Sequence, residues 1–512
     1  MPVIAAIDVG SNAIRLAIAM LTPDGHHEVS HNAREALRLG QDVFATGSIS
    51  PASMERAVEA FGRFREQIER HAVASVKTAA TSAVREAANR DSFVSLIAEK
   101  CEIQISIIGP EEEARLVHLA LKERINLKNR LALLIDIGGG SVEVSLATHT
   151  GILSTESYQM GSVRLLQILE HERLGEKRFN QLVSKYVDTI EQRLKRELGE
   201  QQIDCCIGTG GSIESLGELR RAMFGKNNTS KIRAEELDSA VKTLQGMNID
   251  ERIQKLQLRP DRADVIVPAA IVLQKIVHQA GVDELMIPGI GLKDGLILEM
   301  VSEQFYPEKH LDYDQVISSA LQLGRKYAFD EPHSKAVACL SLQIFDQTRS
   351  IHELDRESRT LLEVAALLHD VGQFISVSNH HKHTFYVLQA NPVIGLTPAQ
   401  MDIVSNVARY HRKSSPKLQH KNYEHLSPKQ RNIVSTLSAI LRVANALDRE
   451  HSGNVRGVDL TFKKPKFSIR LKGEGEMLLA SPGQTHRCRG TGRLGKVHPN
   501  LSAEALARDG RL

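Results

Sequence analysis

Residues 131–147 combine acidic side chains and glycines in a spacing that suits metal-assisted phosphate chemistry. Asp136 ends an apolar run, three glycines follow at positions 138–140, and Glu143 lies in the next, alternating run. Glycines carry no Cβ, so their backbone N–H groups can approach an anion, and carboxylate oxygens suit a hard divalent cation. The stretch therefore predicts either a corner that binds phosphate and magnesium or an ordinary glycine-rich hairpin.

A second copy of this pattern lies near the start of the chain, at residues 6–19. The aligned positions are Asp8 with Asp136, Gly10 with Gly138, and Arg15 with Glu143. A repeat this far apart is typical of two duplicated domains that face each other, not of a solenoid. Such domains would hold a phosphate chain from both sides.

Two further glycine-rich turns follow predicted strands. Residues 203–207 predict a strand that runs into Gly208–Ser212 and then a helical pattern, and residues 284–295 repeat this order beside Lys293 and Asp294. A strand, a glycine-rich loop and a helix N-terminus together direct backbone amides at phosphate. We expect all four glycine-rich corners to face one cleft.

Three glutamates open a helix predicted to begin at Pro110. Compensation of the helix dipole is their simplest explanation, and the alternative is that one of them points into the cleft as a base. Hydrolysis of a phosphoanhydride needs neutralised phosphoryl oxygens and an oriented water, which this residue set can supply. A kinase of the same fold is the other possibility, since nothing in the sequence excludes adenine binding near Gly208–Gly211.

The elements that must position these residues alternate between strand and helix as far as residue 305. Before the central hairpin, we expect a first hairpin at residues 3–19 and strands at 75–80 and 103–108. The predicted helices include residues 51–71, capped by Ser50, and a helix capped by Thr81 or Ser82 that presents Arg85. Strand patterning ends near residues 302–313, and the chain then reads as almost wholly helical to about residue 450. Residues 464–473 predict a further strand.

Composition limits the class of protein. The 512 residues suffice for about three or four domains. A net charge of +3 is too small to indicate a nucleic-acid partner, and five scattered cysteines form no disulfide or zinc pattern. With no apolar run near the length of a membrane span and no signal peptide, we expect a soluble, cytoplasmic protein without membrane association.

Seven motifs in order resemble those of the exopolyphosphatase and guanosine pentaphosphate phosphohydrolase family. They are IDVGSN, TSAVREAAN, EEEARL, IDIGGGSVE, GTGGS, RADVIVPAA and GIGLKDG. The resemblance covers about residues 3–475. It implies the duplicated ribonuclease-H-like fold of actin, sugar kinases and heat-shock ATPases, with the active site between domains I and II.

The same resemblance implies residue roles. Glu113 and Arg85 would be catalytic, with Glu113 as the base, and Asp136 and Glu143 would bind Mg²⁺. The implied phosphate-binding residues are Asp8, Gly10, Ser11, Asn12, Gly138, Gly139, Gly140, Ser141, Gly208, Thr209, Gly210, Gly211, Ser212 and Arg262. Pro110 stands where the family often has glycine, and the extra Glu111 leaves the register of this motif open by one residue.

The helical part resembles HD-domain phosphohydrolases. His333, His369, Asp370 and Asp448 occur in the ligand order of such domains, on separate predicted helices. The resemblance implies a divalent metal here, and the alternative is a degenerate scaffold without chemistry. A basic stretch from Arg409 to Lys421 would either follow a polyanion or form a solvated loop.

We therefore expect four parts. Domains I and II, residues 1–128 and 129–305, would be ribonuclease-H-like α/β domains, followed by an all-α HD-like domain at 312–450 and a small α+β segment at 451–512. From residue 481 onward the chain is rich in glycine and arginine, and we expect residues 481–512 to be poorly packed or irregular.

The expected function is release of terminal orthophosphate from inorganic polyphosphate by a Glu-activated water with Mg²⁺. The alternatives are a guanosine pentaphosphate 5'-phosphohydrolase and a nucleotide-binding regulatory protein without turnover. K⁺ and a second divalent metal in the helical part are further candidate cofactors. We expect a homodimer.

Overall fold

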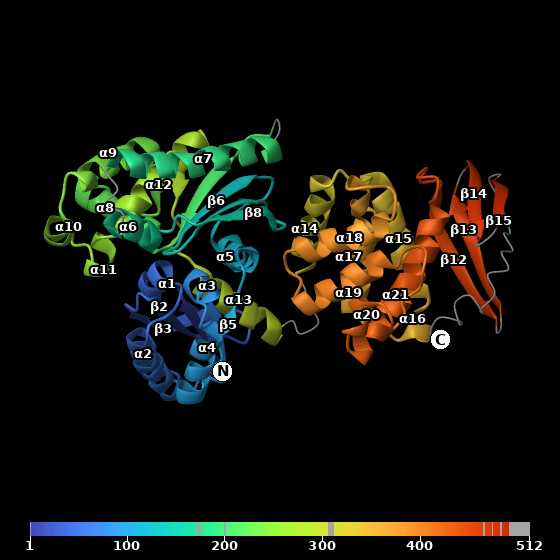
Figure 1. The fold of residues 1–512 in the computed structure, drawn as a ribbon, viewed down its shortest axis with the longest axis horizontal. Helices are drawn as coiled ribbons and strands as arrows, with labels where there is room; N and C mark the ends of the chain where they lie inside the picture. Colours follow the sequence, from blue (N-terminus) through green and yellow to red (C-terminus); the bar gives the residue numbers. More distant parts are fainter. Residues whose placement is uncertain are drawn as a thin grey trace. The chain divides into compact units, whose positions relative to one another are not determined.

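The computed structural model describes residues 2–171, 176–198, 201–305, 312–463, 466–473, 475–481 and 484–490. The chain forms two compact units, residues 1–309 and residues 310–512 (Figure 1). The boundaries of the four domains predicted from the sequence stay predictions.

The first sheet of the first unit has the strand order β3-β2-β1-β4-β5. β3, β2 and β1 are antiparallel, and β4 and β5 extend the sheet in parallel. The strands are β1 (Val3–Val9), β2 (Ile14–Leu21), β3 (His27–Glu35), β4 (Ser75–Ala80) and β5 (Ser106–Ile107). The helices of this half are α1 (Leu39–Thr46), α2 (Pro51–Arg70), α3 (Ser82–Glu86), α4 (Arg90–Cys101) and α5 (Pro110–Arg124).

These elements agree closely with the sequence pattern. The α2 helix begins after Ser50, whose side chain accepts a hydrogen bond from the backbone N–H of Ser53, as a cap should. The strand predicted at 103–108 is shorter, because only two residues of β5 pair with β4 at the edge of the sheet.

A second sheet repeats the arrangement, in the order β10-β11-β9-β6-β7-β8. Its strands are β6 (Ala132–Ile137), β7 (Val142–Ala147), β8 (Ile152–Tyr158), β9 (Cys205–Thr209), β10 (Lys231–Arg233) and β11 (Glu284–Met286). The helices are α6 (Ser162–His171), α7 (Glu176–Leu198), α8 (Gly211–Phe224), α9 (Ala234–Gln245), α10 (Ile249–Leu256), α11 (Pro260–Ala263), α12 (Ile266–Gln279) and α13 (Leu292–Phe305). Both sheets consist of an antiparallel three-strand meander followed by two parallel strands, and the second sheet adds β10 antiparallel at its edge. The predicted α/β duplication is confirmed.

The last helix of this unit, α13, returns to the first sheet. Ile4 and Ala6 of β1 pack with Leu296 and Ile297 of α13, while Ile7 faces the core under α2 and α4. Helices on both faces explain why β1 is apolar at nearly every position.

The α5 helix lies between the two sheets (Figure 1). It packs against α13 on one side and against β7 and β8 on the other. Nε2 of His118 in α5 lies 2.7 Å from the backbone oxygen of Thr148, which follows β7. The first turn of α5 is thereby held where the two halves meet.

The second unit is helical up to residue 447. Its elements are α14 (Tyr313–Lys326), α15 (Glu331–Gln347), α16 (Arg349–His352), α17 (Arg356–Leu368), η1 (Val371–Phe374), α18 (His380–Ala390), α19 (Pro398–Arg409), α20 (Lys421–Glu424) and α21 (Pro428–Leu447). These helices share one hydrophobic core, in which α17 is central. The predicted helical character is confirmed, and the likeness to HD domains stays a prediction.

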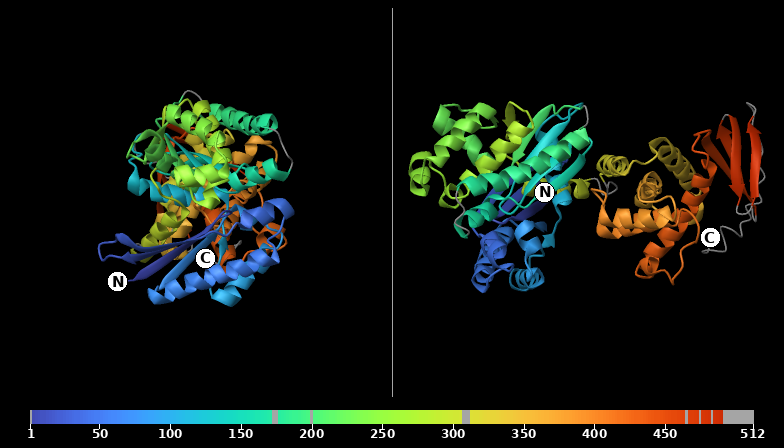
Figure 2. Two further views of the ribbon diagram at one scale, coloured as in Figure 1. Left: turned by 90° about the vertical axis from the view of Figure 1, so that its left-hand side faces the viewer. Right: turned by 45° about the horizontal axis from the view of Figure 1, so that its top comes forward.

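Four strands complete this unit to one side of its helices (Figures 1 and 2). They are β12 (Val455–Lys463), β13 (Lys466–Gly473), β14 (Gly475–Ser481) and β15 (Gln484–Gly490), paired as two antiparallel hairpins. Gln343 of α15 bonds to the edge of β12 by accepting a hydrogen bond from Val458 N–H. The sequence predicts that residues 481–512 are poorly packed or irregular. The second alternative is wrong for residues 484–490, because they pair with β14 along its length. Residues 482–483 and 491–512 lie outside the described residues.

Among the described residues, no helix is both long enough and apolar enough to cross a membrane.

Candidate active site

Two acidic residues occupy equivalent places at the ends of the two central strands. Asp8 near the end of β1 pairs across the sheet with Arg15, and Asp136 near the end of β6 pairs with Glu143. The turns that follow close in the same way. The N–H of Gly10 donates to the oxygen of Ala13 and the N–H of Gly138 donates to the oxygen of Ser141, both at 3.1 Å.

The two turns lie against each other. A Cβ added to Gly139 would come within 2.9 Å of Ser11 Cβ, and one added to Gly140 would overlap the hydroxyls of Ser82 and Ser11. Ser11 and Ser82 are themselves hydrogen bonded at 2.9 Å. Only glycine fits at positions 139 and 140, which brings the predicted phosphate-binding residues of both halves together. Ser82, which the sequence presented only as a helix cap, belongs to this site as well.

The backbone carries further predicted phosphate-binding groups. Gly210 has a φ of +93°, and a Cβ there would lie 2.8 Å from Oδ1 of Asp136. Gly211 opens α8, which places a helix N-terminus beside the carboxylates. A Cβ on Gly211 would meet the guanidinium groups of both Arg262 and Arg15.

Arg262 is a buried cation at this point. Its Nη1 donates to the hydroxyl of Ser212 at 2.7 Å, and its Nε has no hydrogen-bond partner among the described residues. Burial and the neighbouring Arg15 lower the pKa of Arg262 to about 10. A buried guanidinium beside another one favours an anion in front of them.

Glu113 in the first turn of α5 faces the same carboxylates. Its Oε2 is buried without a hydrogen bond, 3.9 Å from Nη1 of Arg85. Arg85 is held in place because Nη1 also donates to the oxygen of Ile108 at 2.7 Å. Glu112, by contrast, pairs with Arg115 at 2.7 Å. Of these two neighbours, Glu113 is therefore the one that lies at the site.

Burial and mutual repulsion perturb the carboxylates. Burial, followed by Glu143 and Asp136, raises the pKa of Glu113 well above its ordinary value. Burial and the charge of Glu143 raise the pKa of Asp136 to about 7, with a hydrogen bond from Thr209 as a partial offset. The pKa of Glu143 is also raised by burial, against hydrogen bonds from Ser141 and Ser157. This accumulation of negative charge is unfavourable unless a cation binds there.

The donor set fits a hard divalent cation. Asp136 and Glu143 offer carboxylate oxygens, and among the described residues no three side-chain ligands converge tightly at this point. Mg²⁺ commonly takes only one or two protein carboxylates and completes its shell with water and substrate phosphate. The residues present thus suit Mg²⁺ together with a phosphate ligand.

The last predicted corner also lies nearby. Asp294 accepts a hydrogen bond from Gly291 N–H at 2.8 Å and so caps α13. Lys293 and Asp294 are close enough to influence the pKa of Asp8, which burial raises and Arg15 lowers. Lys293 and Asp294, which follow the fourth glycine-rich turn, are therefore near Asp8 as well.

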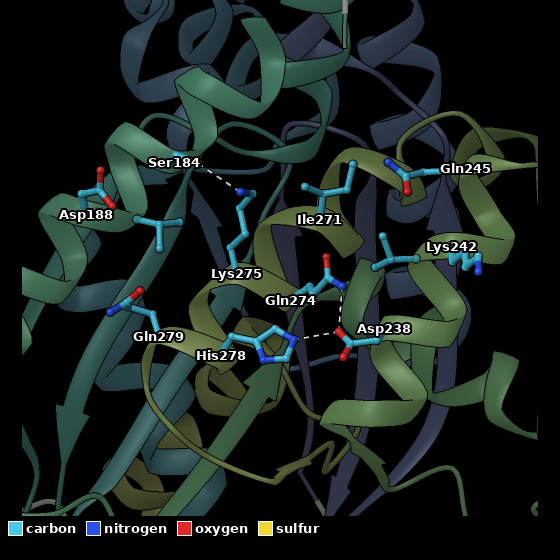
Figure 3. A pocket seen from close by; sticks show the side chains of 12 residues that line it. Ser184, Asp188, Asp238, Lys242, Gln245, Ile271, Gln274, Lys275, His278 and Gln279 are labelled. Carbon is cyan, nitrogen blue, oxygen red and sulfur yellow. Dashed lines mark hydrogen bonds and ion pairs between the residues drawn. The ribbon is translucent and has the colours of Figure 1, made fainter. Parts of the chain in front are cut away.

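A hollow of about 590 Å³ opens elsewhere in this unit, between α7, α9 and α12 (Figure 3). Asp238 is held there by Gln274 and His278, and Lys275 donates to the hydroxyl of Ser184 (Figure 3). The polar groups at its centre are engaged with one another, so we assign the chemistry to the strand ends.

In the helical unit, three of the four predicted metal ligands come together. His333, His369 and Asp370 place their ligand atoms within 4.8 Å of one another. Asp448 instead lies behind His333, whose Nδ1 is 2.8 Å from Oδ2 of Asp448. His380 and His411 join Asp370 in a second such group. The sequence does not mark His380 and His411 as ligands, because they occur only within runs rich in histidine or basic residues.

A family model described as the Ppx/GppA phosphatase family matches residues 21–304, more than half of the chain. The chain belongs to the Ppx/GppA phosphatase family. A second model, Ppx/GppA phosphatase domain III, matches residues 317–482. The α/β unit and the helical unit thus correspond to two parts of Ppx/GppA proteins, and the chain is a phosphatase-family hydrolase.

Relatives within the Ppx/GppA family carry two kinds of name. A guanosine-5'-triphosphate,3'-diphosphate pyrophosphatase from Aliivibrio fischeri is 25% identical over 94% of this chain and 93% of its own. A protein of the same name from Aeromonas hydrophila is 26% identical over 79% of each chain. Among solved structures, an exopolyphosphatase from Cytophaga hutchinsonii matches with a TM-score of 0.55 at 24% identity, over 59% of this chain and 98% of its own. An exopolyphosphatase-like protein matches with a TM-score of 0.52 at 26% identity, over 59% and 100%.

Proposed function

We propose that this chain releases terminal orthophosphate from inorganic polyphosphate, with Glu113 as the base. The observation that carries this proposal is the buried, unpartnered Oε2 of Glu113 beside Asp136 and Glu143, where the two glycine turns meet. A protein that only binds a nucleotide has no need of a proton acceptor at this point.

The residues of the chain divide the work of hydrolysis. Glu113 orients a water and accepts its proton as the water oxygen attacks the terminal phosphorus and the bridging P–O bond breaks. Arg85 and the backbone amides of the two turns neutralise the phosphoryl oxygens. Mg²⁺ held by Asp136 and Glu143 would neutralise further charge on the phosphate when bound.

Guanosine pentaphosphate is the second candidate substrate. The relatives that match nearly the whole chain are named for that nucleotide, whereas the two exopolyphosphatase-named structures match 59% of the chain. Both substrates end in a phosphoanhydride, so the same base and cations serve either one.

One assay separates these possibilities. Purified protein is given polyphosphate or guanosine pentaphosphate with Mg²⁺, and released phosphate is measured for wild type and Glu113→Gln. We expect faster release from polyphosphate and a loss of turnover on the order of 100-fold or more in the variant, at similar substrate affinity. Release from the nucleotide alone would select the second candidate, and wild-type turnover in Glu113→Gln would reject the base.

A further inference from the structure

A group of buried histidines surrounds Asp370 in the helical unit and takes no part in the chemistry above. The group comprises His333 of α15, His369 at the end of α17, His380 at the start of α18 and His411 after α19, and each ring is at most 3% exposed. Buried imidazoles and carboxylates need partners for their polar atoms.

The carboxylate of Asp370 faces imidazole nitrogens with both of its oxygens. Oδ1 lies 3.1 Å from Nε2 of His380 and 3.4 Å from Nε2 of His411. Oδ2 lies 3.6 Å from Nε2 of His369. The rings of His380 and His411 stack nearly parallel, with their Nε2 atoms 3.2 Å apart.

Hydrogen bonds at the other ring nitrogen decide what these Nε2 atoms can do. Nδ1 of His369, His380 and His411 lies 2.7, 3.1 and 2.6 Å from the backbone oxygens of Ala366, Val377 and Ala408, respectively. A carbonyl oxygen only accepts, so each Nδ1 must carry the proton and each neutral ring turns a bare Nε2 lone pair inward.

Lone pairs therefore outnumber hydrogen-bond donors in this group. The amide nitrogen of Gln373 donates to Oδ2 of Asp370, and this contact leaves the other inward-facing atoms unchanged. Nε2 of His369, Nε2 of His333 and Oδ1 of Asp370 are buried and have no hydrogen-bond partner among the described residues. Lone pairs that face one another at such distances repel unless a cation lies between them. Because every ring is oriented by a hydrogen bond from behind, the arrangement has the outer support typical of metal ligands.

We propose that Asp370 bridges a two-cation centre in the helical unit. One cation is held by His333, His369 and Asp370, and the other by Asp370, His380 and His411. Imidazole nitrogen combined with one carboxylate suits a divalent transition metal such as Mn²⁺, Co²⁺ or Zn²⁺ better than Mg²⁺. Asp448 is a positioning residue, because its two oxygens bond to Nδ1 of His333 and to the N–H of Gly453.

Arg412 provides the competing explanation. Its Nη1 lies 3.1 Å from Nε2 of His380, so the guanidinium itself supplies a positive charge to one lone pair. Arg412 is exposed, however, and it approaches His380 alone among the inward-facing nitrogens. It leaves the Nε2 atoms of His333 and His369 without a partner.

The test is cobalt binding to the full chain after removal of metals with a chelator. Bound Co²⁺ is counted by elemental analysis in excess Mg²⁺, and its visible absorption reports nitrogen ligands. We expect two tightly bound ions in wild type, one in His380→Gln and in His411→Gln, and none in Asp370→Asn. The matched control is His425→Gln, a half-exposed histidine of the same unit, which should bind two.

Rescue distinguishes lost ligands from lost folding. His380→Cys restores a metal-binding atom, so we expect its second ion to return with a near-ultraviolet thiolate-to-cobalt band. Equal cobalt in wild type, His380→Gln and His411→Gln would overturn the second position. Wild type that binds no cobalt in excess Mg²⁺ would overturn the whole centre and leave the Arg412 explanation.

Discussion

The two equivalent residue pairs at the strand ends of the first unit differ in charge although their backbone pairing is the same. Asp8 is paired with the guanidinium of Arg15 at 2.9 Å, whereas Asp136 lies across from the carboxylate of Glu143. In the first half, Arg15 is therefore the counter-ion of the aspartate. In the second half, the two carboxylates require a bound cation as their counter-ion. This difference makes Asp136 the more sensitive of the two aspartates to pH and metal.

The first prediction follows from the raised pKa of Asp136, about 7 against 3.8 ordinarily. The folded protein keeps a proton that the unfolded chain releases, so this stabilisation is fully present below the unfolded pKa of 3.8 and is lost as pH rises from there through the folded pKa of about 7. In chelator, Asp136→Asn should melt higher than wild type at pH 8, on the order of a few degrees, and the difference should be clearly smaller at pH 5, because only part of the stabilisation is lost at that pH. The control is Asp188→Asn, an exposed position, and an identical pH dependence in both variants would contradict the prediction.

A second prediction at this scale concerns Gly210. Its positive φ disfavours any side chain, and a Cβ would stand 2.6 Å from the backbone oxygen of Ile137 and 2.8 Å from Oδ1 of Asp136. Gly210→Ala should therefore lose about 1–3 kcal/mol of stability and most phosphate release.

Gly225 separates the two effects, because it also has a positive φ but nothing lies within 4 Å of an added Cβ. Gly225→Ala should lose about 1 kcal/mol of stability and keep its activity. Equal activity in the two alanine variants, measured at saturating substrate, would show that crowding at Asp136 is unimportant.

At the scale of elements, α5 and α13 decide where Glu113 lies. A Cβ on Gly295 of α13 would stand 2.1 Å from the backbone oxygen of Leu116, so the two helices touch backbone to backbone. The sequence predicted α5 from its first turn and predicted the corner before α13, since both depend on local residues. It did not predict that α13 packs on the first sheet, because that contact depends on residues nearly 300 positions apart.

The third prediction tests this close approach. Gly295→Ala should push α13 away from α5, lower the melting temperature by several degrees, and reduce turnover because Glu113 moves with α5. Gly62→Ala in α2 is the control, since nothing lies within 4 Å of a Cβ there and helix propensity should make it neutral or stabilising. Unchanged turnover in Gly295→Ala would show that α5 is positioned by β7 and β8 alone.

At the scale of the whole molecule, the sequence established more of the first unit than of the second. The ordered motifs predicted the α/β duplication and most residues of the carboxylate site, because each motif is short and contiguous in the sequence. His380 and His411 were missed as partners of Asp370, since they come from two further helices and nothing local marks them. The sequence predicts Asp448 as a metal ligand, whereas in the fold its Oδ2 lies 2.8 Å from Nδ1 of His333, on the side of the ring away from the other ligands. The homodimer stays a prediction.

The fourth prediction assigns each cation to one unit. Hydrogen exchange with Co²⁺ in excess Mg²⁺ should protect amides around residues 366–372 and 380–384, and Mg²⁺ with a short polyphosphate should protect 138–141 and 208–212. Asp370→Asn should lose only the first effect and Asp136→Asn only the second. Protection by Co²⁺ confined to the α/β unit would contradict the assignment.

The return of α13 has a mechanical consequence. The chain passes between the two halves of the α/β unit twice, once after α5 and once through residues 287–291, where Gly289 has a positive φ and both Gly289 and Gly291 have open space around them. Two such connections would restrict the motion of one half relative to the other to a hinge rotation about the line that joins the connections. A ligand held by Ser11 on one side and Gly138–Ser141 on the other would then fix a single angle between the two halves. The size of the bound substrate would therefore set how far the two halves close.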